Sequence, residues 1–391
     1  FSSQLVNEDT GGDEAMETNE DNDPEDVEPI AITDILLEEN DNEESYSLPP
    51  HHKCVAHTLN LIATKDATDA EKDATYKKLS RSTFAKCQAL WNKQSRSPLA
   101  ADTIKDKCGV YFILPNATRW NSTFDAMQGL AKIGEQNLLY LCDSLGVQKL
   151  RSSEILFIAE YCRVMNPVAA SLDKLQSVKQ MYMGYLLPTL TILKQRLLAL
   201  QSAVGTEKLH YCKPLAESLL LGVETRFGPL FNDNDLLLAS VLHPKFKLNW
   251  LSSQEEKEAA KRALGVSVRA YCSTLGHIEA TEPGRINTSG ADKDDNDDDK
   301  FYTFTQNREN MSNNKELENM ELYLTQVNTM LSSLDSFPVL KALFIKHNTC
   351  IPSSAPVERL FSAGGGIMVP NRANLSDENF EKQLMLNANK F

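Results

Sequence analysis

The chain has 391 residues, of which 41% are hydrophobic, 24% charged and 7% aromatic, a composition typical of a globular protein with one large or two medium domains. Its formal net charge of -14, taken alone, argues against a polyanionic partner such as DNA. No run approaches the roughly 20 consecutive apolar residues of a membrane span. The eight cysteines are scattered without a CxxC pair, which excludes a disulfide framework and a complete zinc finger and favours a reducing compartment.

The negative charge is concentrated in two tracts. Residues 1–50 hold 17 Asp and Glu and no Lys or Arg, and residues 281–300 hold 7 acidic and 3 basic residues. Residues 51–280 carry 29 basic and 21 acidic residues, so the middle of the chain is basic. We therefore predict acidic disordered segments over 1–50 and 281–315. The net negative charge comes from these two segments, so it does not argue against DNA binding by the rest of the chain.

Between these segments the sequence predicts mainly helices. Apolar residues recur at helical spacing after residue 51, but GVYFIL at 109–114 is a short β-branched and aromatic run that stops at Pro115, which predicts one buried strand. Residues 121–280 show successive apolar stripes of period 3.6, and residues 316–391 continue with helices. The predicted fold class is mainly α with a small α/β part in 51–120.

The first polar motif is His51-His52-x-Cys54-x-x-His57. Cys54 and His57 at i and i+3 of a helix could supply two of the four ligands that zinc normally takes. No second pair follows at finger spacing. Two interpretations stay open, a metal site and a structural pair packed in the helix and its preceding turn, and the structural one is favoured.

The second motif is Arg119-Trp120, just after the predicted strand. A guanidinium beside a large aromatic ring could grip a phosphate and stack on a base. The alternative is that Trp120 covers the core between the strand and the helices. For catalysis, no GxSxG, GxxxxGK[ST] or HExxH motif is present, and we interpret the glycines at 364–366 as a turn.

The C-terminal string IPSSAPVERLFSAGGGIMVPNRANL resembles the dimerisation region of the hAT transposase superfamily, with its P-x-S-A-x-x-E-R-x-F-S core and an Arg-containing turn. The matching residues are Pro352, Ser354, Ala355, Glu358, Arg359, Phe361, Ser362 and Arg372. Upstream, CVAHTLNL is similar to the family's C-x-x-H helix and TRWNS to its Arg-Trp segment. ASVLHPKFK is similar to its L-D-P-R-x-K segment, with His243 in place of the usual Asp.

The resemblance spans roughly 51–391 and implies a split RNase H-like domain interrupted by a large all-helical insertion over 121–280. The module at 316–391 would complete the RNase H-like fold and mediate oligomerisation. It also implies that Trp120 is the base-stacking aromatic with Arg119 as its neighbour, and that Cys54 and His57 belong to the wall of the active site.

Strand transfer in this family requires a DDE triad that holds two divalent ions, because Mg²⁺ and Mn²⁺ prefer carboxylate oxygens. By the resemblance, the two Asp residues and a DNA-binding finger precede residue 1. The Glu stands four positions before a Tyr-Leu pair, and Tyr323-Leu324 places Asn319 there. An amide is only a neutral ligand, so we expect an inactive protein without a metal cofactor.

The resulting hypothesis is a non-catalytic, nuclear, hAT-derived protein that forms homodimers or higher oligomers and associates with DNA, with no membrane contact. One alternative is an active Mg²⁺- or Mn²⁺-dependent transposase whose Asp residues lie upstream. Another is a protein-interaction scaffold that does not bind DNA.

Overall fold

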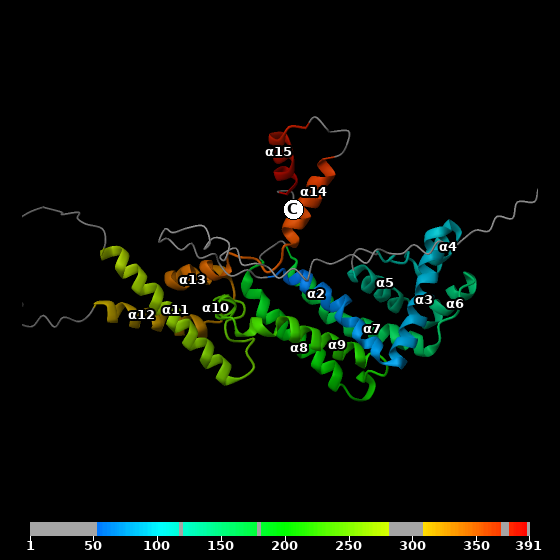
Figure 1. Ribbon diagram of the computed structural model, residues 1–391, viewed down its shortest axis with the longest axis horizontal. Coiled ribbons are helices and arrows are strands. Elements are labelled where there is room, and N and C mark those ends of the chain that lie inside the picture. The colour runs from blue at the N-terminus through cyan, green and yellow to red at the C-terminus, as the bar shows by residue number, and fades with distance from the viewer. Residues whose placement is uncertain (1–52, 117–119, 178–180, 281–307, 369–374, 389–391) are drawn as a thin grey trace, which may run out of the picture. The chain divides into compact units, whose positions relative to one another are not determined.

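The computed structural model describes residues 53–116, 120–177, 181–280, 308–368 and 375–388. Within these ranges the regular structure is helical and no strand is formed, so the predicted mainly α class is confirmed (Figure 1). The α-helices are α2 (Val55–Thr64), α3 (Ala74–Arg96), α4 (Pro98–Cys108), α5 (Trp120–Ile133), α6 (Glu135–Ser144), α7 (Ser152–Leu175), α8 (Leu186–Ser202), α9 (Lys213–Phe227), α10 (Asn234–Val241), α11 (Gln254–Ala280), α12 (Arg308–Thr325), α13 (Pro338–Asn348), α14 (Ala355–Ile367) and α15 (Asp377–Ala388).

The predicted acidic segment 1–50 and most of 281–315 lie outside the described residues. α12 begins at Arg308, inside the second expected segment. The described chain from residue 53 onward forms one compact unit. A division of this unit into an RNase H-like part, an insertion and a C-terminal module stays a prediction.

Several helix ends follow directly from local sequence. The Asp73 carboxylate accepts a 2.7 Å hydrogen bond from the Tyr76 N–H at the start of α3. α4 begins after the cap Ser97, whose hydroxyl accepts from the Ala100 N–H, and it ends at Gly109 with φ 74°. Short polar caps satisfy the free N–H groups of a first turn, and glycine adopts the left-handed conformation at little steric cost.

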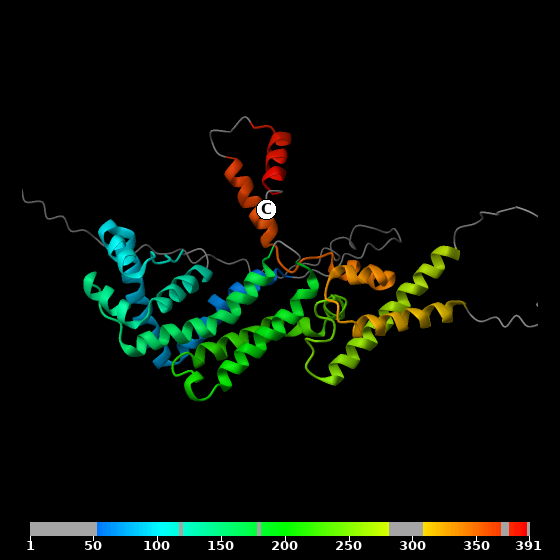
Figure 2. The same cartoon turned by 180° about the vertical axis from the view of Figure 1, so that it is seen from behind.

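The first hydrophobic core is built around α7, which packs against α2, α3, α5 and α8. Figures 1 and 2 both show α7, α8 and α9 side by side. Among the described residues, α7 is the one helix long and apolar enough to cross a membrane, but 61% of its apolar window is buried against the rest of the protein. Because its apolar side chains are already covered by other helices, α7 is the central core helix of this bundle.

The Glu154 carboxylate, buried on α7, is fully engaged. Glu154 lies 2.6 Å from the Lys86 ammonium and 2.6 Å from the Ser82 hydroxyl, and it accepts from the Arg151 N–H. Burial opposes ionisation of Glu154, but the hydrogen bonds from Lys86 and Ser82 outweigh it and leave its pKa below the ordinary value. A buried charge is tolerated only with such partners.

A second core joins α10, α11, α12 and α13. The short helix α10 belongs to both cores. Leu236 and Ala239 lie in the first core, whereas Leu238, Val241 and Leu242 lie in the second. Residues three and four apart share one face of a helix, so α10 presents one face to each core.

The strand predicted at 109–114 is wrong for the described residues, where this segment forms no strand. A strand requires a neighbouring strand to take its main-chain hydrogen bonds. Here the side-chain amide of Gln94 takes that place, since it accepts from the Phe112 N–H at 2.7 Å and donates to the Phe112 carbonyl at 3.0 Å. Phe112 is buried, while its apolar neighbours are exposed.

Candidate functional site

The C-terminal signature begins in a buried turn and continues into α14. Pro352 and Ala355 are buried, and the Pro352 carbonyl accepts a 3.0 Å hydrogen bond from the Val55 N–H at the start of α2. The C-x-x-H helix and the signature, about 300 positions apart in the chain, are therefore in direct contact. Their contact was not predicted, because each motif was interpreted separately.

Cys54 completes this junction. Its Sγ lies 3.1 Å from the Ser354 hydroxyl and 3.4 Å from the Ser354 main-chain nitrogen, at the start of α14. Burial would raise the pKa of the Cys54 thiol, but the hydrogen bonds from Ser354 and the His57 N–H outweigh it and place the pKa below its ordinary value. Cys54 therefore connects two helix starts.

No group of three or more His, Cys, Asp or Glu side chains in the described part of the chain could hold a metal ion. Cys54 contacts Ser353 and Ser354. The structural role of the Cys54 and His57 pair stays a prediction.

α14 and α15 pack against each other as a helical hairpin (Figures 1 and 2). The glycines at 364–366 belong to α14, so the predicted turn is wrong. A Cβ on Gly364 would lie 3.2 Å from the Phe380 ring and 3.6 Å from Leu384, so the absence of a side chain lets α15 approach closely. Glycine is a poor helix former, which explains why the sequence pattern indicated a turn.

The hairpin leaves large apolar side chains exposed. Phe361, a member of the signature, is 72% exposed, and Leu386 and Met385 on α15 are 65% and 53% exposed. Val357 and Met368 add to the exposed apolar area of α14. Single exposed apolar residues are common, but this many on two short paired helices is typical of a protein interface.

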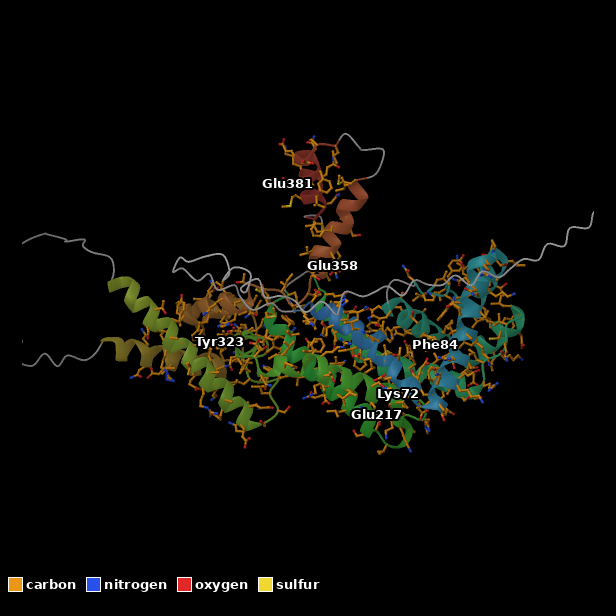
Figure 3. All side chains as sticks on the ribbon, in the orientation of Figure 1. Lys72, Phe84, Glu217, Tyr323, Glu358 and Glu381 are labelled. Carbon is orange, nitrogen blue, oxygen red and sulfur yellow. The ribbon has the colours of Figure 1, made fainter. Side chains whose placement is uncertain are left out.

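The polar signature residues lie on the same helix. Glu358, labelled in Figure 3, is exposed and hydrogen-bonds the Ser354 hydroxyl. The Arg359 guanidinium donates a 2.7 Å hydrogen bond to the carbonyl of Gln176, just beyond α7. Ser362 is exposed. Arg372 lies outside the described residues.

Trp120 is the first residue of α5, and Arg119 lies outside the described residues. The Trp120 ring is half-buried against the first core, 6.4 Å from the Phe124 ring. Its indole N–H is enclosed and has no hydrogen-bond partner among the described residues. The ring therefore packs as a core-covering residue does, whereas its stacking on a DNA base stays a prediction.

His243, in place of the family's Asp, is 3% exposed and lies among the rings of Tyr182, Tyr185, Phe246 and Phe344. Burial, with a smaller effect of Lys245, lowers the His243 pKa to about 4, so the imidazole is neutral at pH 7. Its Nδ1 accepts from the Lys245 N–H at 3.2 Å. An aspartate can accept the same i to i+2 hydrogen bond, so the histidine preserves the turn.

Asn319 and Tyr323 are one helical turn apart on α12. The Asn319 amide donates to the Glu316 carboxylate at 3.3 Å. Tyr323, labelled in Figure 3, is fully buried, its hydroxyl donates to the Leu242 carbonyl at 2.7 Å, and the Lys247 ammonium lies 4.7 Å from its ring centroid. The Tyr323 that was used to place Asn319 by resemblance is therefore a core residue.

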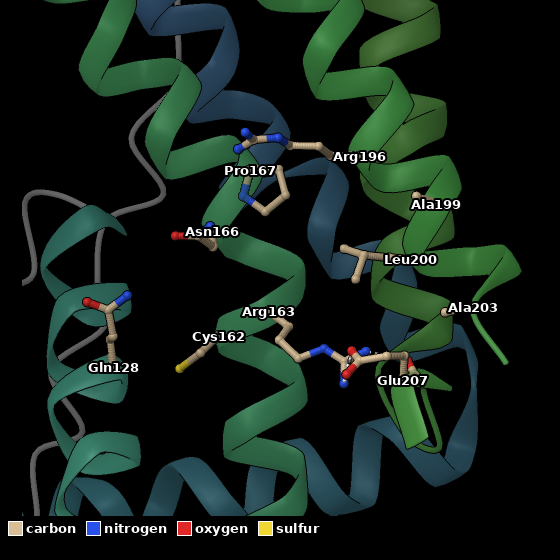
Figure 4. A pocket seen from close by; sticks show the side chains of 10 residues that line it. All are labelled: Gln128, Cys162, Arg163, Asn166, Pro167, Arg196, Ala199, Leu200, Ala203 and Glu207. Carbon is tan, nitrogen blue, oxygen red and sulfur yellow. Dashed lines mark hydrogen bonds and ion pairs between the residues drawn. The ribbon is translucent and has the colours of Figure 1, made fainter. Parts of the chain in front are cut away.

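A groove of about 720 Å³ lies beside α7 and α8 (Figure 4). The Arg163 guanidinium pairs with Glu207 at 3.4 Å, and the Arg196 side chain extends toward Pro167 across the groove. Ala199, Leu200 and Ala203 make its α8 wall apolar. None of the residues predicted from the sequence lines this groove.

The chain is distantly similar in sequence to a BED zinc-finger protein. One match is to "Zinc finger BED domain-containing protein 4" of Homo sapiens, which is 21% identical over 365 residues. The alignment covers 86% of this chain and 29% of that protein. No family model matches the chain.

Proposed function

We propose that this chain is a non-catalytic, hAT transposase-derived nuclear protein that dimerises through α14 and α15 and associates with DNA. The RNase H-like architecture with a helical insertion is part of this proposal. The observation that carries it is the exposure of Phe361 at 72% within the signature helix. The named relative's BED zinc finger supports a DNA-related, nuclear role.

The chemistry of the hairpin supports the proposed dimerisation. Burying one Phe or Leu side chain contributes roughly 1.5–3 kcal/mol, and Phe361, Met385 and Leu386 are all available. A second copy presents the same apolar surface, so a twofold interface would cover both copies at once.

Size-exclusion chromatography with light scattering tests this. The wild-type chain should be dimeric at micromolar concentration, and Phe361→Ala should weaken the dimer at least about tenfold because each interface loses two buried rings. Leu99→Ala on α4 is the matched control, since Leu99 is 78% exposed but lies outside the hairpin. A monomeric wild type, or equal effects of both substitutions, would contradict dimerisation through the hairpin.

DNA association is supported by the basic balance of 51–280, 29 basic against 21 acidic residues. Phosphate contacts release counterions, so the affinity for duplex DNA should fall steeply as salt rises. A salt-independent signal, or none at low salt, would favour the scaffold alternative.

The absence of catalysis is proposed from Asn319, whose amide bonds Glu316. If the alternative of an active transposase held, Asn319→Glu in a longer chain that contains the upstream residues should raise Mg²⁺- or Mn²⁺-dependent DNA cleavage. We expect no gain, with Asn319→Gln as the uncharged control.

A further inference from the structure

Residues 110–114 present a free main-chain edge. In an extended chain the N–H and C=O of one residue point to the same side, and those of the next residue to the opposite side. Gln94 pairs with both groups of Phe112. Across a trans peptide the C=O of one residue and the N–H of the next point to opposite sides, so the Tyr111 C=O and the Ile113 N–H point away from Gln94. None of the main-chain N–H and C=O groups of Tyr111 and Ile113 is hydrogen-bonded to a described residue.

The side chains along this edge are also uncovered. Val110, Tyr111, Ile113 and Leu114 are 60%, 48%, 51% and 41% exposed, although all four are residues that sheets normally bury. Beside them lies a cavity of about 550 Å³, bounded by this segment and by α5. An exposed apolar edge of this kind is a template for pairing with another strand.

Basic side chains predominate at the rim of the edge, where Asp125 is the one acidic side chain among the described residues that line the cavity. The Lys105 ammonium lies 5.1 Å from the Tyr111 ring centroid, Lys107 lies 4.5 Å from the Tyr140 ring centroid, and Lys132 lines the cavity. None of these three lysines forms an ion pair with a described residue. A second copy of this edge would bring the same positive rim against the first, so the charges favour a different, acidic partner.

We propose that the Tyr111–Ile113 edge binds an extended, β-branched peptide segment with acidic flanks, supplied by another protein, by main-chain pairing. The pairing uses the four free groups of Tyr111 and Ile113, and the cavity receives side chains of the added strand. This mode of recognition draws affinity from main-chain hydrogen bonds and selectivity from alternate side chains. It goes beyond the proposed function, which does not use this edge.

The test uses a fluorescent decapeptide, Glu-Glu-Thr-Val-Thr-Val-Thr-Val-Glu-Glu, and the same peptide N-methylated on its six central residues. Fluorescence anisotropy with the whole chain should show binding of the first and none of the second, and hydrogen exchange should show new protection at Tyr111 and Ile113. Binding of both peptides alike, binding of neither, or self-association through this edge would overturn the proposal.

Two proline variants add a matched comparison. Ile113→Pro removes an N–H on the free edge and should weaken peptide binding about tenfold. Leu114→Pro removes an N–H on the Gln94 side and should change the affinity for the peptide less than about threefold. Equal losses of peptide binding in the two variants would contradict the placement of the Ile113 N–H on the free edge and of the Leu114 N–H on the Gln94 side. Thermal unfolding checks that both variants fold. Phe361→Ala should leave peptide binding unchanged, so this result is independent of dimerisation.

Discussion

The buried imidazole of His243 makes the stability of this protein sensitive to acid. Its pKa is about 4 in the folded chain against an ordinary value of 6.5, because burial among four aromatic rings, and to a lesser extent Lys245, disfavours the charged form. The unfolded chain binds the proton more readily, so this contribution is complete above pH 6.5 and is lost as pH falls toward 4. One pKa unit corresponds to about 1.4 kcal/mol, so about 2.5 kcal/mol is lost between pH 7 and pH 4.5.

Urea unfolding of the wild type and His243→Asn across this pH range measures the effect. Asparagine does not titrate and can still accept from the Lys245 N–H. Other groups, such as His347 with its lowered pKa, titrate in both proteins and cancel in the difference. The wild type should lose about 2.5 kcal/mol relative to the variant. Parallel pH profiles would refute the placement of a neutral His243 in the aromatic cluster.

Three substitutions test the packing by the same unfolding measurement. Lys86→Met should cost about 3 kcal/mol, because it leaves the buried Glu154 carboxylate without its cation, whereas Lys78→Met on the exposed face of α3 should change less than about 0.5 kcal/mol. Gly184→Ala should cost about 2 kcal/mol or more, because its Cβ would lie 2.3 Å from the Ala239 carbonyl oxygen. Gly365→Ala meets nothing within 4 Å and should stabilise α14 by about 0.5–1 kcal/mol; a loss there would contradict its helical placement.

Helices were predictable because their signals are local. The cap Ser97 followed by Pro98, and Gly109 at the end of α4, can be read within a few positions. Ser376 before α15 is a cap of the same kind, and its hydroxyl accepts from the Asn379 N–H. Such caps depend only on neighbouring residues, so no tertiary information is needed.

The errors arose where long-range contacts decide the conformation. The run at 109–114 has strand-forming side chains, but pairing requires a partner strand, and Gln94 is what contacts Phe112. The glycines at 364–366 are poor helix formers, yet the contact of Gly364 with Phe380 places them in α14. Tertiary packing overrides intrinsic propensity in both cases.

The motifs of the candidate site were predicted one by one, but their contacts with each other were not. The C-x-x-H helix and the signature were both recognised, but the contact between Cys54 and Ser354 joins positions 300 apart, and no local pattern encodes it. His243 was recognised as a departure from the family pattern. Its effect became interpretable only when the Nδ1 hydrogen bond to Lys245 and the surrounding rings were located.

The central claim is that two copies meet through α14 and α15, and a photo-crosslink from position 361 tests it most directly. Replacing Phe361 with p-benzoylphenylalanine places a reactive ketone on the 72% exposed side chain. Irradiation of the chain at micromolar concentration, followed by peptide mapping, should give covalent dimers whose crosslinks fall within 355–388 of the second copy. Crosslinks that fall elsewhere, or a chain that stays monomeric, would contradict the account.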